Sequence, residues 1–134
     1  MLHLNSNAET VAASPEKVYQ VLTQFFHQDM SQLPGVSGWE TLENGCRFNV
    51  QDQIQCQLTL TEQVPNSRVA YKAETDKPVS AEVVFDIEPE GDATRLQGHL
   101  DVNVPFFLQG MVKGLIDKFM GTAMQYLKTA IERS

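Results

Sequence analysis

Few side chains in this sequence have the type and position that acid–base chemistry requires. A general acid or base works best where burial tunes its pKa, so it should point into the interior. Tyr71 lies at an inward position of a predicted strand, where its hydroxyl could orient a ligand or donate a proton. We favour a position at the rim, because a buried tyrosine hydroxyl needs a hydrogen-bond partner. His99 has outward parity, and His27 follows a predicted helix end, where capping or exposure is favoured over a contact at a pocket mouth.

Nucleophilic and metal chemistry also find little support in the residue pattern. Cys46 and Cys56 are the only cysteines, and Cys56, at an inward position, is interpreted as a small buried hydrophobe. The three histidines are scattered singly, without the spacing of a zinc site. Asp52 in a turn and Asp101 on the outward side of a strand do not form a carboxylate pair. We therefore predict no catalytic residues, no metal site and no cofactor.

The length and charge of the chain limit its partners. With 134 residues, 42% hydrophobic and 20% charged, it suits one globular domain spanning 1–134. A net charge of −7 disfavours nucleic acid and anionic membrane, which attract clustered cations. The most apolar stretch, Val102–Met124, is interrupted by Lys113, Asp117 and Lys118, so stable membrane insertion is not expected. The two cysteines and an N-terminus without a secretory signal pattern predict a cytoplasmic protein.

The N-terminal third predicts one strand followed by two short helices. The strand is expected within Leu2–Ala13, and Ser14 and Pro15 then give a helix start that runs to about Phe26. A second short helix, roughly Gln28–Leu33, is ended by the following proline and glycine.

From Val36 the hydrophobic period changes to two, which predicts six antiparallel strands with one apolar face. Asn44 and Gly45 form a strong hairpin signal between the first two of these strands. Inward positions alternate with polar ones in every strand, and they include the following residues: Cys46, Phe48, Val50, Ile54, Cys56, Leu58, Leu60, Val69, Tyr71, Val83, Phe85, Leu96 and Leu100.

The period becomes helical again from Phe106 to about Glu132. One apolar stripe comprises Leu108, Met111, Leu115, Phe119, Ala123, Tyr126 and Ala130, and a second set widens it: Val112, Ile116, Met120, Met124, Leu127 and Ile131. The helix and the sheet each have one apolar face, and packing one on the other covers both. We predict an α+β helix-grip fold, in which a curved antiparallel sheet of six or seven strands surrounds this helix and leaves an apolar pocket.

The element order and several short runs resemble the START-like superfamily. The runs are Val11–Tyr19 (VAASPEKVY), Leu33–Val36 (LPGV), Glu62–Pro65 (EQVP) and the Thr94–Leu96 strand (TRL) before a long helix. The superfamily includes Bet v 1-type plant pollen allergens, START lipid-transfer domains, polyketide cyclases and G-like carbon monoxide dehydrogenase subunits. The resemblance covers nearly the whole chain and implies a cavity for an apolar molecule such as a lipid, sterol, quinone or polyketide. It does not by itself imply catalysis.

Our first hypothesis is a noncatalytic binder or carrier of a small hydrophobic ligand. The residues expected to line its pocket are Trp39, Phe48, Leu58, Tyr71, Phe85, Phe107, Met111, Leu115 and Phe119. Gly110, Gly114 and Gly121 are unusual within a helix. For the first two, close approach to the sheet is the preferred explanation, and softening of the helix to admit a ligand is the alternative.

Two other functions stay open at this point. One is a protein-interaction module with a filled core, and the other is a cyclase- or hydratase-like enzyme that uses Tyr71 or a histidine as proton donor. The sequence does not distinguish a monomer from a dimer.

Overall fold

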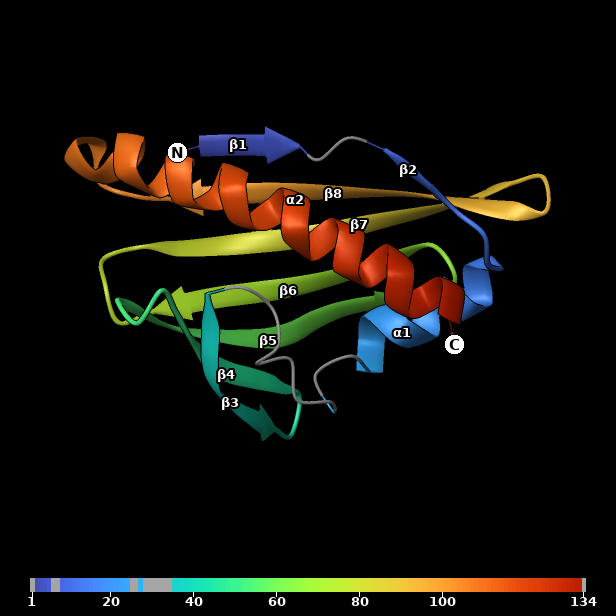
Figure 1. Ribbon diagram of the computed structural model, residues 1–134, viewed down its shortest axis with the longest axis horizontal. Helices are drawn as coiled ribbons and strands as arrows, with labels where there is room; N and C mark the ends of the chain where they lie inside the picture. Colours follow the sequence, from blue (N-terminus) through green and yellow to red (C-terminus); the bar gives the residue numbers. More distant parts are fainter. Residues whose placement is uncertain (1, 6–7, 25–26, 28–34, 134) are drawn as a thin grey trace.

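The structure is a computed structural model that describes residues 2–5, 8–24, 27 and 35–133; the side chains at positions 115, 118–120, 122 and 123 lie outside this description. Figure 1 shows one curved sheet crossed diagonally by a long helix. The elements, in chain order, are β1 (Leu2–Asn5), β2 (Glu9–Val11), α1 (Pro15–Gln24), β3 (Val36–Leu42), β4 (Gly45–Val50), β5 (Ile54–Val64), β6 (Arg68–Thr75), β7 (Ser80–Glu90), β8 (Ala93–Asn103), the 3₁₀ helix η2 (Phe106–Leu108) and α2 (Gln109–Arg133).

The eight strands form one antiparallel sheet. Its order is β1-β8-β7-β6-β5-β4-β3, and β2 pairs with β8 beside β1. The predicted first strand is thus two strands, which raises the total by one. All other pairs are sequential hairpins, so strands that are neighbours in the chain are neighbours in the sheet. The predicted α+β helix-grip fold is confirmed.

Helix α1 begins as the sequence predicts. The backbone N–H of Lys17 donates to the Ser14 hydroxyl at 3.2 Å, and Pro15 is the first helical residue. Val18 and Leu22 on its inner face are fully buried. The predicted second short helix, 28–33, falls outside the described residues.

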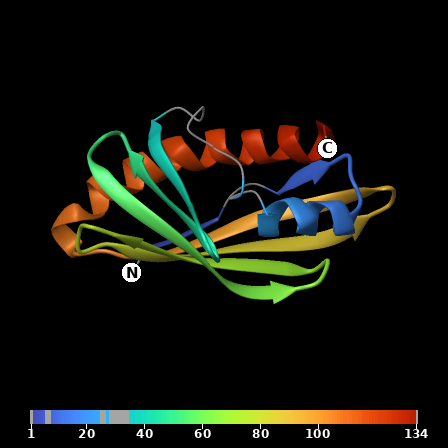
Figure 2. The same cartoon turned by 90° about the horizontal axis from the view of Figure 1, so that it is seen from below.

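Helix α2 lies in the hollow of the sheet. Figure 2 shows β3, β4 and β5 rising beside the helix, whereas β7 and β8 pass beneath it. The buried positions of α2 include Val112, Met124, Leu127 and Ile131. These residues belong to the set that widens the predicted stripe, whereas Met111 is 56% exposed. The helix is therefore rotated from the predicted phase, because two adjacent apolar rows leave its exact facing undetermined by periodicity.

The core consists of two clusters of buried side chains. One gathers Val11, Val18, Leu22, Phe48, Tyr71, Phe85, Leu96, Met124, Leu127 and Ile131 with their neighbours, between α1, the sheet and the C-terminal half of α2. The other contains Leu100, Val102, Val104 and Val112, at the end of the sheet where α2 begins. Val83 packs against both clusters. The space between the two clusters is where a cavity can form.

Candidate ligand-binding cavity

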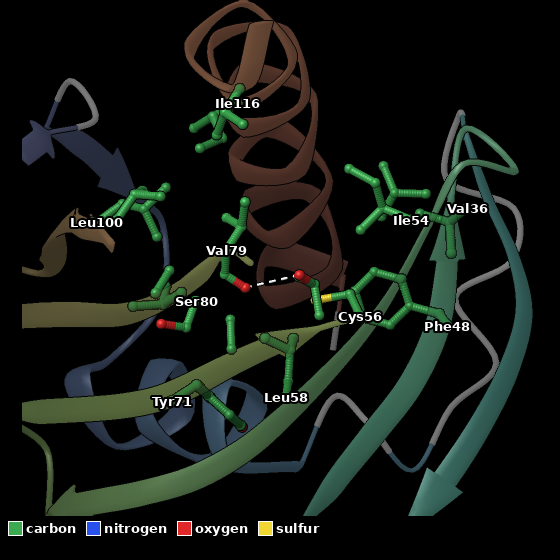
Figure 3. A pocket seen from close by; sticks show the side chains of 18 of the residues that line it. Val36, Phe48, Ile54, Cys56, Leu58, Tyr71, Val79, Ser80, Leu100 and Ile116 are labelled. Carbon is green, nitrogen blue, oxygen red and sulfur yellow. Dashed lines mark hydrogen bonds between the residues drawn. The ribbon is translucent and has the colours of Figure 1, made fainter. Parts of the chain in front are cut away.

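A cavity of about 290 Å³ lies between α2 and the concave face of the sheet and is partly open to solvent. Figure 3 shows Val36, Phe48 and Ile54 on one side of it, Leu100 on the other and Ile116 on α2. Both core clusters contribute to its walls. The lining residues are Val36, Trp39, Phe48, Val50, Ile54, Cys56, Leu58, Tyr71, Ala73, Thr75, Val79, Ser80, Ala81, Val83, Phe85, Gly98, His99, Leu100, Val102, Val112, Ile116, Met124, Tyr126 and Leu127.

A β-bulge brings Trp39 to the cavity. The register between β3 and β4 shifts between Ser37 and Glu40, and Gly38 within the bulge has a φ of +62°. A bulge opposes two residues to one and so reverses the parity of the residues after it. Trp39 therefore faces the same side as Phe48, and the two rings stack with centroids 5.1 Å apart. Alternation alone leaves Trp39 undecided between core and rim, and the bulge resolves this.

Tyr71 is buried beneath the cavity and is only 1% exposed, so the predicted rim position is wrong. Its hydroxyl donates to the backbone carbonyl of Leu22 at 2.5 Å. Leu22 lies in the last turn of α1, where a helix leaves its carbonyls without amide partners. Burial, with a smaller contribution from nearby Cys46, raises the pKa of Tyr71 above its ordinary value. The hydroxyl is therefore a neutral donor that joins β6 to the end of α1.

Replacing Tyr71 with Phe should lower the free energy of unfolding by about 1–3 kcal/mol. The change leaves the ring in place but removes the donor from a buried carbonyl. Chemical denaturation of both proteins measures the difference. Tyr19→Phe is the control, because Tyr19 is only partly buried and lies on α1 itself. Equal stability of Tyr71→Phe and the wild type would contradict the assigned hydrogen bond.

Other polar groups at the lining are also engaged within the protein. The Thr75 hydroxyl donates to the Val79 carbonyl at 2.7 Å, the bond dashed in Figure 3. Cys46 and Cys56 are free thiols on neighbouring strands. Burial raises the pKa of Cys56 to about 11, and burial together with the neighbouring Cys56 raises the pKa of Cys46 to about 12. Both thiols are thus protonated at neutral pH and poor nucleophiles.

The histidines have carboxylate or amide partners on the outer face of the sheet, the face turned away from α2, or are exposed. The two ring nitrogens of His99 lie 2.7 Å from the Asn5 amide oxygen and 2.7 Å from the Asp86 carboxylate. His3 pairs with Asp101 on the same face. His27 is exposed. Although His99 contributes to the cavity wall, its ring nitrogens are directed to partners elsewhere.

Of the nine lining residues expected from the sequence, five lie at the cavity: Trp39, Phe48, Leu58, Tyr71 and Phe85. The structure places Phe107 and Met111 outside it, 81% and 56% exposed. Phe107 belongs to the 3₁₀ turn η2 that precedes α2, so it does not follow the α-helical phase. For Leu115 and Phe119 the side chains lie outside the description.

Several wall residues are absent from the expected set, although their pattern contains the necessary signal. Ile54, Val83 and Leu100 have inward strand parity, and Val112 and Ile116 belong to the second row of the helix stripe. Close approach to the sheet does not explain the helix glycines, because a Cβ at Gly110 or Gly114 would meet no atom within 4 Å.

Neither a metal centre nor a membrane-spanning helix is found in the part of the chain that the structure describes. No three His, Cys, Asp or Glu side chains among these residues are grouped to hold a metal ion. Likewise, none of the described helices combines the length and apolarity needed to cross a bilayer.

The whole chain resembles solved structures of the same architecture. A START superfamily protein from Mycobacterium smegmatis is 24% identical, with a TM-score of 0.74 over 98% of this chain and 97% of that one. A conserved protein from Geobacillus kaustophilus is 17% identical, with a TM-score of 0.76 over 99% and 97%. The Aha1 protein of Colwellia psychrerythraea, solved as a dimer, is 22% identical, with a TM-score of 0.66 over 98% and 97%. These similarities establish the fold.

Family membership rests on a sequence comparison. Curated protein sequences give no significant match. The model of the family described as polyketide cyclase / dehydrase and lipid transport matches residues 5–132. This range includes all the described strands from β2 to β8, α1 and nearly all of α2. The chain therefore belongs to the polyketide cyclase / dehydrase and lipid transport family, within the START-like superfamily that its sequence resembles.

Proposed function

We propose that this protein binds or transports a small hydrophobic molecule in the cavity between α2 and the sheet, without transforming it chemically. The observation that carries the proposal is the cavity itself, about 290 Å³ with walls made almost wholly of apolar side chains. Such a space lies at the lower end of the roughly 300–1,000 Å³ typical of small-molecule sites. Binding would remove apolar surface from water, at about 25 cal/mol per Å².

The position of the cavity supports a binding role over a filled interaction module. A core packed to ordinary density has few voids larger than a water molecule. Here the void separates two clusters of buried residues, so an occupant would contact both at once.

The engagement of the polar groups supports a carrier over an enzyme. A proton donor must reach a ligand atom, but the Tyr71 hydroxyl donates to Leu22 and its pKa is raised. The nitrogens of His99 face Asn5 and Asp86. A Tyr71→Phe variant that folds should therefore bind ligands as the wild type does, whereas an enzyme with Tyr71 as proton donor would lose turnover.

Native mass spectrometry of the protein purified from cells tests the proposal directly. A carrier should retain a small molecule, seen as a mass increment that disappears on denaturation. Trp39 provides a second measurement, because it lines the cavity and stacks on Phe48. Its fluorescence should change on titration with apolar compounds. If no apolar compound produces either signal, the proposal fails.

Filling the cavity should weaken this binding without loss of stability. Ala73 lines the cavity, and Ala73→Leu would place three further carbon atoms inside it. We expect the dissociation constant of a fluorescent apolar probe to rise by about tenfold or more, roughly 1.4 kcal/mol. The melting temperature should stay level or rise, because the void receives the added atoms.

The matched control is Lys72→Leu, which places the same side chain on the adjacent residue. Lys72 is exposed and has the opposite strand parity. Probe affinity in this variant should equal that of the wild type. Equal affinity in both variants would mean that the probe binds elsewhere.

A further inference from the structure

The walls of the cavity contain very few ionisable side chains. Among the described lining residues there is no Asp, Glu, Lys or Arg, and the ionisable ones are Cys56, Tyr71, His99 and Tyr126. The charged side chains of the central strands alternate onto the opposite face, where Lys72, Glu74 and Glu82 are exposed. A charged group inside the cavity would therefore meet no opposite charge among these residues.

Hydrogen-bond donors that could replace a charge partner are also engaged. The Tyr71 hydroxyl donates to Leu22, and the Thr75 hydroxyl donates to Val79. Both ring nitrogens of His99 face oxygens of Asn5 and Asp86. The remaining polar side chains of the lining, Ser80 and Tyr126, are uncharged at neutral pH.

An ion that enters such a space loses its hydration without compensation. Transfer of an unpaired carboxylate or ammonium into an apolar environment costs several kcal/mol even after relaxation, far more than transfer of an ester or ether oxygen. Burial already keeps the proton on the Cys56 thiol, which lines the same cavity and has a pKa of about 11. A bound carboxylic acid would be subject to the same effect.

We propose that the cavity selects uncharged, mainly hydrocarbon molecules and excludes ionised ones, so that free carboxylates such as fatty-acid anions are not its ligands. This inference rests on the proposed function and specifies its ligand class. Recognition is by shape and apolar contact, and ring compounds or neutral esters of small size fit the walls.

The test compares two probes that differ only in charge, 2-naphthoic acid and its methyl ester. Trp39 fluorescence and isothermal titration calorimetry measure the binding of each probe at pH 7.5. We expect the ester to bind about 100-fold more tightly than the acid, which is ionised at this pH. As pH falls from 7.5 to 5.5, acid binding should strengthen by about tenfold per unit, because the neutral fraction rises by that factor. The ester should show no such pH dependence.

Two charge variants on one strand extend the test. Ala81 lines the cavity, so Ala81→Lys should shift the ester-to-acid preference toward the acid by about tenfold or more. Glu82 is the next residue and is exposed, so Glu82→Lys should leave the preference at the wild-type value. Circular dichroism establishes that each variant is folded. The wild-type comparison decides the proposal by itself if Ala81→Lys does not fold.

The outcomes separate this inference from the proposed function. If the ester binds and the acid binds equally well or better at pH 7.5, the selection for neutral ligands is wrong and the binding role stands. If a folded Ala81→Lys keeps the wild-type preference, the probe does not occupy the cavity and the inference fails. If neither probe binds, both the inference and the proposed function are overturned.

Discussion

Replacing Gly45 with Ala should destabilise the protein by about 3 kcal/mol or more and lower its melting temperature by roughly 10 °C. A Cβ at this position would lie 1.8 Å from the backbone oxygen of Leu58 and 2.8 Å from its carbonyl carbon. Non-bonded heavy atoms pack at about 3.5–4.0 Å, so β4 and β5 would have to separate here. Because the obstacle is backbone in the paired strand, no side-chain rotation can relieve it.

Gly114→Ala is the matched control, with the same chemical change in a different setting. A Cβ at Gly114 would meet nothing within 4 Å, and the residue lies inside α2. Alanine should therefore stabilise the helix by up to about 1 kcal/mol. Thermal and urea denaturation of both variants give the comparison. Similar stabilities would show that the strands do not approach as closely as described.

Alkaline solution should destabilise the protein by on the order of 4 kcal/mol between pH 9 and pH 11.5. The ordinary pKa of a cysteine thiol is 9.0 here, and burial raises it to about 12 for Cys46 and to about 11 for Cys56. Tyr71 is shifted in the same direction. The unfolded chain thus loses these protons at a lower pH than the folded protein does.

The sign follows from this difference in bound protons. Below about pH 9 all three groups are protonated in both states, and their contribution to stability is constant. Above pH 9 the folded state holds more protons, so the free energy of unfolding falls as pH rises toward 12. Urea denaturation at a series of pH values measures the slope.

A double variant, Cys46→Ala with Cys56→Ala, identifies the groups responsible. It should be less stable at pH 7, because two buried side chains are shortened. Its slope between pH 9 and 11 should nevertheless be much smaller than that of the wild type, since mainly Tyr71 then contributes. An unchanged slope would assign the alkaline effect to other residues.

Strand alternation predicts the fold and half of the cavity wall because a pleated sheet fixes which residues share a face. Phe48, Leu58 and Phe85 follow from parity alone, and all three line the cavity. Alternation fails where an extra residue enters a strand. The bulge at Gly38 reverses the facing of Trp39, and a local φ of +62° is not visible in the hydrophobic pattern.

Features that depend on long-range contacts are not visible in local patterns. Tyr71 is predicted at the rim because its partner, the Leu22 carbonyl, is a backbone atom 49 residues away. Asn44 and Gly45 correctly predict a hairpin, but Gly45 is the first residue of β4, and it is required by the approach of Leu58 on the next strand. The phase of α2 depends on which of two apolar rows the sheet receives.

The pairing of β1 and β2 with β8 has a consequence for how the chain acquires its structure. Strands β3 to β8 form successive hairpins from local contacts, but His3 meets Asp101 across 98 residues. Closing such a large loop before its contacts form is entropically costly and slows folding. During synthesis the first strands have no partner until β8 has emerged, and the concave face stays wet until α2 follows. The chain thus depends on its last quarter to become a closed globule, and truncation there should leave an aggregation-prone open sheet.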